Sequence, residues 1–270
     1  MRAARWAMIM LLAGVLTAAC RQPSTPSPPV LRWSAVPDRE AQSVRAQHLP
    51  LMDAVCQGAA VQCRWVDAAT YAEVVEKLGD GSIDIAFLGG VTFARAHARH
   101  GAIALVMRDI DTRFTSVVVV RSADAARSIQ NLQGRSFTFG DRDSTSGHVM
   151  ARHFLSAQGI DPDKFFSRVG YSAGHDNTLH AVADGEVDAG CLNASIAYAA
   201  LAPGGPYQGR LRMIWESPAY PDYAWTARRG LPVELRQRLI DAFLDLDNST
   251  AGSRLALASE SARGFVPAFA

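Results

Sequence analysis

Short apolar runs alternate with amphipathic segments along the roughly 240 residues that follow residue 30, and this alternation constrains the fold more than any other feature. Several runs, such as residues 117–120, are apolar throughout, as in strands covered on both faces. Between the runs, Thr70 and Glu73 have the spacing of a helix capping box, and Leu239 and Phe243 share one helical face. Strands alternating with helices predict an α/β protein with mostly parallel sheets. We expect strands at residues 32–36, 62–66, 83–88, 116–121, 135–139, 168–171, 187–192 and 211–216.

Two segments about 100 residues apart have the same pattern. In each, a helix-like stretch is followed by an Asp-Gly turn and a short strand that contains an aspartate, Asp84 or Asp188. The pattern is compatible with a common helix-to-strand turn in which glycine provides the left-handed cap. It also fits two lobes of like construction, with residues 115–121 as a candidate crossing strand between them.

The N-terminus has the layout of a secretory signal, with Arg2 and Arg5 followed by an apolar run at residues 6–16. That run is shorter than the roughly 20 apolar residues that span a bilayer. The Leu-Thr-Ala-Ala sequence before Cys20 resembles the lipobox of bacterial lipoproteins, in which the cysteine is acylated and becomes the new N-terminus. We therefore expect a signal peptide at residues 1–19 and lipid on Cys20. The alternative is an ordinary cleaved signal followed by a chance cysteine.

Four of the nine residues 21–29 are proline, which excludes a helix or a central strand and predicts an extended tether over residues 20–30. The remainder is long enough for one large domain or two of moderate size. Lys and Arg number 27 against 26 Asp and Glu, so the charge gives no indication of a nucleic-acid partner.

Three cysteines follow Cys20, and two of them, Cys56 and Cys63, are close in the sequence. In an oxidising compartment this pair predicts a local disulfide, with two separate buried thiols as the alternative. Cys191 is then left without a partner.

Residues 139–147 read as the end of a strand, a turn and the start of a helix, with the hydroxyl residues Ser144, Thr145 and Ser146 at that start. Free backbone N–H groups and the positive end of the helix dipole point outward there, so the segment is a candidate anion site. It is not a P-loop, since no Gly-Lys-Ser/Thr follows. Simple N-capping, which needs only one of the three hydroxyls, is the alternative.

Two further strand-to-helix turns carry candidate residues. His175 and Asp176 lie at the carboxyl end of a strand, where open α/β sheets bind ligands. Gly89 and Gly90 allow backbone to approach a ligand closely. The alternatives are an incidental surface histidine in the first turn and an ordinary tight turn in the second.

The sequence does not favour catalysis or a cofactor. Ser144, His175 and Asp188 could be combined as a hydrolase triad, but no G-x-S-x-G motif is present. HExxH and CxxC motifs are also absent, and His97 and His100 lack a third metal ligand nearby in the sequence. We expect no enzyme activity, no metal and no cofactor.

The motifs in chain order are LRWSAVPDRE, YAEVVEKLGDGSIDIAFLGGVTFARA, FTSVVVVR, NLQGRSFTFGDRDSTSGHVMARHFL, GHDNTLHAVADGEVDAG and WESPAYPDYAW. This order resembles the phosphonate/phosphite-type (PhnD-like) periplasmic substrate-binding proteins of ABC transporters over residues 31–246. The STSG and GHD elements at this separation are specific to the family when taken together. It implies a two-lobed type II periplasmic binding protein, each lobe a mostly parallel sheet flanked by helices, joined by hinge strands. Lobe 1 would comprise residues 31–115 and 225–270, and lobe 2 residues 116–224.

The resemblance also implies which residues bind the ligand. The STSG hydroxyls and the GHD histidine would hold an oxyanion, and the first lobe would add aromatic side chains, with phenylalanine at a position where many members have tyrosine. The expected site is Ser144, Thr145, Ser146, His175, Tyr71, Phe93, Asp176 and Gly90. Aminophosphonate binders carry an acidic residue where this chain has Asn193-Ala194-Ser195, so an aminophosphonate is disfavoured.

The implied function is that of a lipid-anchored, monomeric periplasmic protein. It would capture a small oxyanion such as phosphonate, phosphite or phosphate for an ABC permease in the inner membrane. The alternative is a sensor of arsenite or a selenium oxyanion that presents its closed form to a membrane histidine kinase. A thiolate from Cys191 would suit arsenite, whereas a buried apolar role is the commoner one for a free cysteine.

Overall fold

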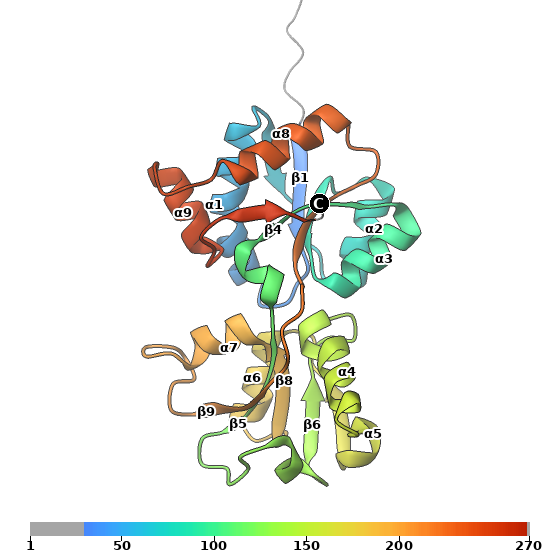
Figure 1. Ribbon diagram of the computed structural model, residues 1–270, viewed down its shortest axis with the longest axis vertical. Helices are drawn as coiled ribbons and strands as arrows, with labels where there is room; N and C mark the ends of the chain where they lie inside the picture. Colours follow the sequence, from blue (N-terminus) through green and yellow to red (C-terminus); the bar gives the residue numbers. More distant parts are fainter. Residues whose placement is uncertain (1–29, 269–270) are drawn as a thin grey trace, which may run out of the picture.

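The computed structural model describes residues 30–268 and arranges them in two lobes (Figure 1). We call the six-stranded sheet with its helices lobe 1, and the five-stranded sheet with its helices lobe 2. The two-lobed α/β architecture predicted from the sequence is confirmed. The predicted signal peptide (1–19), the lipidation site Cys20 and the predicted tether up to residue 29 lie outside the described residues.

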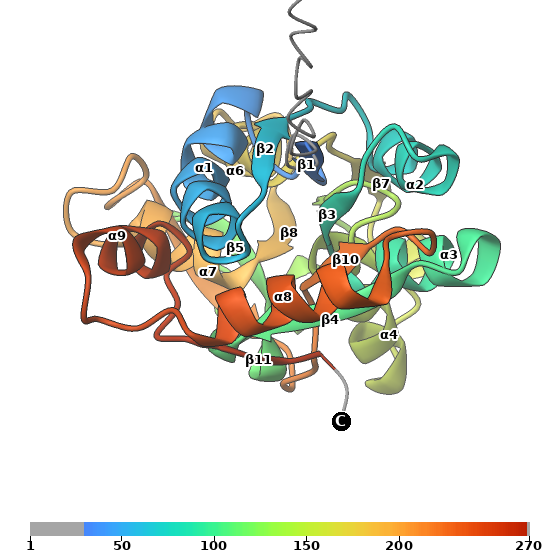
Figure 2. The ribbon, with the colours of Figure 1, turned by 90° about the horizontal axis from the view of Figure 1, so that it is seen from above.

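The first part of lobe 1 comprises β1 (Val30–Ala35), α1 (Ala41–Gly58), β2 (Gln62–Trp65), α2 (Tyr71–Asp80), β3 (Ile85–Leu88), α3 (Gly90–His100) and β4 (Ile103–Arg108). The chain returns to it for β10 (Ala224–Ala227), α8 (Val233–Leu244), α9 (Ala251–Ser259) and β11 (Phe265–Pro267). In Figure 2, α1 and α9 lie together on one side of this lobe and α2 and α3 on the other. The core includes Trp33 and Trp225, fully buried with ring centroids 5.0 Å apart.

Lobe 2 comprises β5 (Ser116–Arg121), a 3₁₀ turn (Ile129–Leu132), β6 (Ser136–Phe139), a π-helical turn (Thr145–Val149) that runs into α4 (Met150–Ala157), α5 (Pro162–Phe165), β7 (Arg168–Tyr171), α6 (His175–Ala183), β8 (Ala189–Asn193), α7 (Ala194–Leu201) and β9 (Leu211–Glu216). Each of the eight expected strands is present, within one to two residues at either end.

The sheets are mixed, whereas the sequence pattern predicted mostly parallel ones. In lobe 1, β1 pairs in parallel with β2 and β3, but β10 pairs antiparallel with both β3 and β4. In lobe 2, β6 is parallel to β7 and β8, whereas β5 is antiparallel to β8 and β9. β5 and β10 each directly follow a crossing between the lobes, and the C-terminal β11 is also antiparallel to its neighbour β4.

The two crossings run side by side and are hydrogen-bonded to each other. The first consists of a 3₁₀ turn (Asp109–Arg113) and the residues up to β5, and the second of residues 217–223. Backbone bonds of 2.7 and 2.9 Å join Phe114 and Tyr220 in both directions, and the Asp222 N–H donates to the Asp111 carbonyl at 3.0 Å. This pairing holds residues 217–223 against the first crossing.

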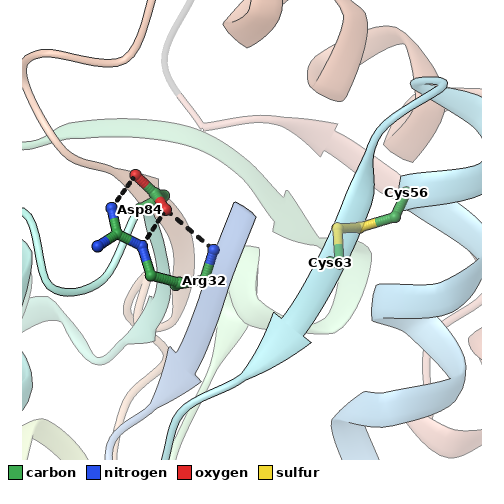
Figure 3. The surroundings of a disulfide bond; sticks show 4 residues. All are labelled: Arg32, Cys56, Cys63 and Asp84. Atoms are coloured by element: carbon green, nitrogen blue, oxygen red, sulfur yellow. Dashed lines mark hydrogen bonds and ion pairs between the residues drawn. A yellow bond between two sulfur atoms is a disulfide. The ribbon is translucent and has the colours of Figure 1, made fainter. Parts of the chain in front are cut away.

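The repeated helix–turn–strand pattern is a repeated structure. The Asp84 carboxylate accepts the backbone N–H of Arg32 in β1 at 2.9 Å, and the Asp188 carboxylate accepts that of Ser136 in β6 at 3.0 Å. Figure 3 shows Asp84 also held by the Arg32 guanidinium. Each aspartate therefore anchors the first parallel strand of its lobe. Both turns place glycine in the left-handed region, with φ of 81° at Gly81 and 80° at Gly185.

A disulfide joins Cys56 at the end of α1 to Cys63 in β2, with the Cα atoms 6.2 Å apart (Figure 3). It ties the first helix to the edge strand of the lobe 1 sheet. Among residues 30–268, no helix combines the length and apolar character needed to cross a membrane.

Candidate functional site

The loop between β6 and α4 forms the lobe 2 part of the site. Ser144 caps the following turn, because its Oγ accepts the Gly147 N–H at 3.0 Å. The loop closes on itself where the Gly140 N–H donates to the Gly147 carbonyl at 2.8 Å. A Cβ on Gly140 would lie 3.1 Å from the Gly147 Cα, so a side chain here would force the two backbone segments slightly apart. The result is a π-helical turn, a form that often occurs at functional sites.

The three hydroxyls predicted to bind an anion have different surroundings. Ser144 acts as the cap, and Thr145 Oγ1 accepts the Val91 N–H of lobe 1 at 3.0 Å. The Ser146 hydroxyl is fully buried and has no hydrogen-bond partner among the described residues. Since an unsatisfied buried hydroxyl is costly, Ser146 is a strong indication of a ligand-binding role.

His175, at the start of α6, presents a second unpartnered group. The ring is fully buried, and burial lowers its pKa, so it is neutral at pH 7. The Asn193 N–H lies 3.5 Å from Nδ1 and donates to it, which leaves the proton on Nε2. Within the described chain, Nε2 has no partner. His175 thus offers one N–H donor and no charge.

Tyr71 is the lobe 1 counterpart. It is the first residue of α2, whose start is fixed by the predicted capping box: Thr70 Oγ1 accepts the Glu73 N–H at 3.1 Å. The Tyr71 hydroxyl is buried and makes no hydrogen bond of normal geometry with the described residues, although the Ser144 hydroxyl lies beside it. Burial raises the pKa of Tyr71 well above its usual value, so the phenol keeps its proton and can donate.

Asp222, in the second crossing, is a site residue that the sequence reading missed. One carboxylate oxygen, Oδ1, accepts the Gly90 N–H at 2.9 Å, while Oδ2 is buried and has no partner in residues 30–268. Burial raises the pKa of Asp222 to about 7, although the Gly90 N–H and the Thr145 hydroxyl oppose the rise. Near neutral pH this carboxyl can therefore carry a proton.

A second set of polar groups connects the lobes beside His175. The His175 N–H donates to the Asp38 carbonyl at 2.7 Å. The Asp38 carboxylate accepts from the Tyr223 hydroxyl at 3.1 Å, and that hydroxyl accepts from the Asn193 side chain at 3.3 Å. A cavity of about 100 Å³ adjoins these three residues. Sequence reasoning assigned no role to Asp38 or Tyr223, although both lie in the quoted motifs VPDRE and YPDYAW.

The other predicted residues have different positions. Gly90 contributes its N–H to Asp222, as described above. Asp176 lies at the edge of the cleft, where its carboxylate accepts the Glu40 N–H at 3.2 Å. Phe93 is on the first turn of α3, partly buried against the lobe 1 core, with its ring 5.8 Å from that of His97. Across the same cleft, Arg95 of lobe 1 forms an ion pair with Asp143 of lobe 2.

Within residues 30–268, these buried groups near the contact between the lobes have no hydrogen-bond partner: the hydroxyls of Tyr71 and Ser146, Nε2 of His175 and Oδ2 of Asp222. The first three are neutral donors, and the fourth becomes one when protonated. Such a set suits a small oxyanion, because charge-assisted hydrogen bonds to an anion are strong. It suits an anion better than a cation, because the ionised Asp222 carboxylate is the one charged acceptor among the four groups.

Metal and thiol chemistry receive no support. The described residues contain no cluster of three or more His, Cys, Asp or Glu side chains able to hold a metal ion. Cys191 is fully buried in β8, where its Sγ lies 3.5 Å from the Ser146 carbonyl oxygen and donates to it. Burial raises the pKa of the Cys191 thiol, so it stays protonated rather than acting as a thiolate ligand.

Comparison with known proteins identifies relatives over most of the chain. Residues 34–270 match the family described as ABC transporter, phosphonate, periplasmic substrate-binding protein. The probable ABC transporter phosphite binding protein PhnD1 of Prochlorococcus marinus (strain MIT 9301) is 28% identical over 230 residues, 82% of this chain and 77% of that protein. The phosphate-import protein PhnD of Mycolicibacterium smegmatis is 24% identical over 254 residues, 88% of this chain and 79% of that protein.

Solved structures show the same architecture. PhnD1 from Prochlorococcus marinus in complex with methylphosphonate is similar with a TM-score of 0.83 and 27% identity, over 88% of this chain and 92% of that one. A binding protein component of an ABC phosphonate transporter from Pseudomonas aeruginosa has a TM-score of 0.79 at 22% identity, over 89% and 82% of the two chains, and supports the fold alone. The fold is that of the type II periplasmic binding proteins.

Proposed function

The chain belongs to the periplasmic substrate-binding proteins of phosphonate ABC transporters, and on that premise we propose that it captures a small phosphorus oxyanion between its lobes. Proteins of this family bind and deliver a ligand and are not enzymes, and they work in the periplasm. The observation that carries the proposal is the set of four unpartnered buried groups at Tyr71, Ser146, His175 and Asp222.

The chemistry of these groups supports a small anion as the ligand. An anion buried between the lobes loses its water and needs several hydrogen bonds in return. Tyr71, Ser146 and His175 each supply one donor, and a protonated Asp222 supplies a fourth. Because these donors are neutral, they hold the anion by hydrogen bonds and not by a positive charge of their own. Asp222 and the ligand would then share a proton. This favours an oxyanion that can carry a proton near neutral pH, as phosphorus oxyanions can and sulfate cannot.

The substituent on phosphorus would be small and uncharged. The relatives differ in the ligands that their names give, namely phosphite, phosphate and, for the solved complex, methylphosphonate. Here the segment after β8 offers no carboxylate for an ammonium group: the Asn193 side chain instead caps α7, accepting the Ile196 N–H at 3.1 Å. We therefore assign methylphosphonate, phosphite or phosphate as the ligand class and disfavour aminophosphonates.

Calorimetric titration at pH 7 tests the proposal with methylphosphonate, phosphite, phosphate, sulfate and 2-aminoethylphosphonate. We expect at least one of the first three to bind with a Kd at least about tenfold lower than that of sulfate. Failure of all three would reject the proposed function. Tight binding of 2-aminoethylphosphonate would instead make Asp222 the partner of its ammonium group.

Lipid anchoring through Cys20 is part of the same proposal. It rests on the lipobox-like residues 16–20 and on the proline-rich segment after them. Such a tether would keep the binding protein close to its permease. In cell fractionation, we expect the native chain with the membranes and the Cys20→Ala variant, if exported, in the soluble periplasmic fraction. A native chain found only in that soluble fraction would rule out the anchor.

A further inference from the structure

Helices α3 and α6 both begin at the cleft with glycine as the N-cap, Gly89 and Gly174, and so have no side-chain cap of their own. Helix starts usually use serine, threonine, aspartate or asparagine to satisfy their first N–H groups. Here the opposite lobe satisfies them. The Val91 N–H of α3 donates to Thr145 Oγ1 of lobe 2 at 3.0 Å, and the His175 N–H of α6 donates to the Asp38 carbonyl of lobe 1 at 2.7 Å.

Backbone conformation does not require glycine at either position. Gly89 has φ of −70° and Gly174 has φ of −171°, both accessible to any residue. What a side chain would meet is the other lobe. A Cβ on Gly89 would lie 2.9 Å from Thr145 Oγ1 and 3.3 Å from Asp222 Oδ1, and one on Gly174 would lie 3.0 Å from the Asp38 carbonyl oxygen. The two glycines therefore allow the lobes to approach this closely.

We propose that these contacts form a reciprocal cap that sets the closed position of the lobes, with Thr145 as its central positioning residue. The inference rests on the proposed function and assigns Thr145 a role that Ser146 lacks. A threonine hydroxyl has one donor and two acceptor sites. The Thr145 hydroxyl of lobe 2 accepts the Val91 N–H of lobe 1 at 3.0 Å. This partner is within reach only when the lobes are together.

Closure then depends on two kinds of contact. The ligand is bound by Tyr71, Ser146, His175 Nε2 and Asp222 Oδ2. The lobes are held to each other by two hydrogen bonds, from Val91 to Thr145 and from the His175 N–H to Asp38. In an open form, the N–H groups of Val91 and His175 would return to water. A ligand shifts the population towards the closed form because its contacts come from both lobes at once. The reciprocal cap sets the relative position of the two lobes in the closed form.

Gly89→Ala tests the inference because it adds one methyl group and changes no polar side chain. We expect its affinity for methylphosphonate to fall on the order of tenfold to 100-fold, as for an overpacked contact. We also expect its radius of gyration in saturating ligand, from small-angle X-ray scattering, to stay near the open value. Gly252→Ala is the matched control, since a Cβ there meets nothing within 4 Å. A Gly89→Ala variant that closes and binds like the wild type would overturn the proposal.

Thr145→Val provides a second test, should Gly89→Ala not fold. It keeps the shape of the side chain and removes the acceptor for Val91. Amide exchange followed by NMR should show faster exchange at Val91 in this variant, with His175 less affected. Unchanged protection at Val91 would contradict the proposal. Without ligand, the fraction of wild-type molecules that is closed still protects the Val91 N–H, and this residual protection should be lower in Gly89→Ala. That comparison tests the closing contact even if no phosphorus oxyanion binds and the proposed function fails.

Discussion

Replacing Ser146 with alanine is expected to weaken binding of the phosphorus oxyanion by about 10-fold to 100-fold, the usual worth of one hydrogen bond to a charged group. The stability of the free protein should stay the same or rise. The Ser146 hydroxyl is fully buried and has no partner within the described structure. Burying it without a hydrogen bond destabilises the folded protein, and the alanine variant does not have this destabilisation. Calorimetry gives the affinity, and the melting temperature without ligand gives the stability.

Ser144→Ala is the matched control, two residues away in the same loop. The Ser144 hydroxyl has a structural partner, the Gly147 N–H at 3.0 Å. Its loss should lower the free energy of unfolding by about 1 kcal/mol, as for other N-caps. Opposite effects of the two variants on the melting temperature would separate a ligand donor from a helix cap. If Ser146→Ala instead destabilised the free protein and left affinity unchanged, Ser146 would not be a ligand residue.

Replacing Asp222 with asparagine is expected to remove most of the pH dependence of binding above neutrality. Burial raises the pKa of Asp222 to about 7 in the folded chain. Above that pH the carboxylate repels a fully ionised ligand, so the wild-type affinity should fall about tenfold for each further pH unit. The side-chain oxygen of asparagine can accept the Gly90 N–H. Its NH₂ group can donate to the ligand in place of the protonated Oδ2 of Asp222. Its affinity should therefore stay nearly constant between pH 8 and 10, where the wild type loses about 100-fold.

The same substitution should change stability with a definite sign. The folded pKa of Asp222 lies above its usual value of 3.8, so folding favours the protonated form. The contribution of Asp222 to stability is then greatest below about pH 4 and is lost as the pH rises towards 7. Asp222→Asn should melt at a higher temperature than the wild type at pH 8 and at nearly the same temperature at pH 4. Parallel curves for the two proteins across this range would show that Asp222 is not a buried carboxyl with a raised pKa.

Much of the fold could be predicted because apolar runs and helical faces depend on local sequence. The strands that the pattern missed are β4, β10 and β11. β10 is only Ala-Trp-Thr-Ala, and it becomes a strand because it fits between β3 and β4 in the sheet. β11 is three residues long and ends in proline. Neither has a periodicity of its own, and the mixed sheets follow from the two crossings, which no local pattern specifies.

The site was only partly predictable for a similar reason. Ser146 and His175 lie in polar turns after strands, where the rule for open α/β sheets directs attention. Asp222 lies between Pro221 and Tyr223 in a segment that resembles a plain connection. Its importance comes from burial against Gly90 and Thr145, which are distant in the sequence. The separate roles of Thr145 and Ser146 are likewise invisible in the sequence, because both are adjacent hydroxyl residues at one helix start.

A crystal structure of the chain with methylphosphonate tests the central claim most directly. We expect the phosphonate oxygens within hydrogen-bond distance of the Tyr71 hydroxyl, Ser146 Oγ, His175 Nε2 and Asp222 Oδ2, with the contact from Val91 to Thr145 retained. Methylphosphonate bound elsewhere, with these four groups still unpartnered, would contradict the account.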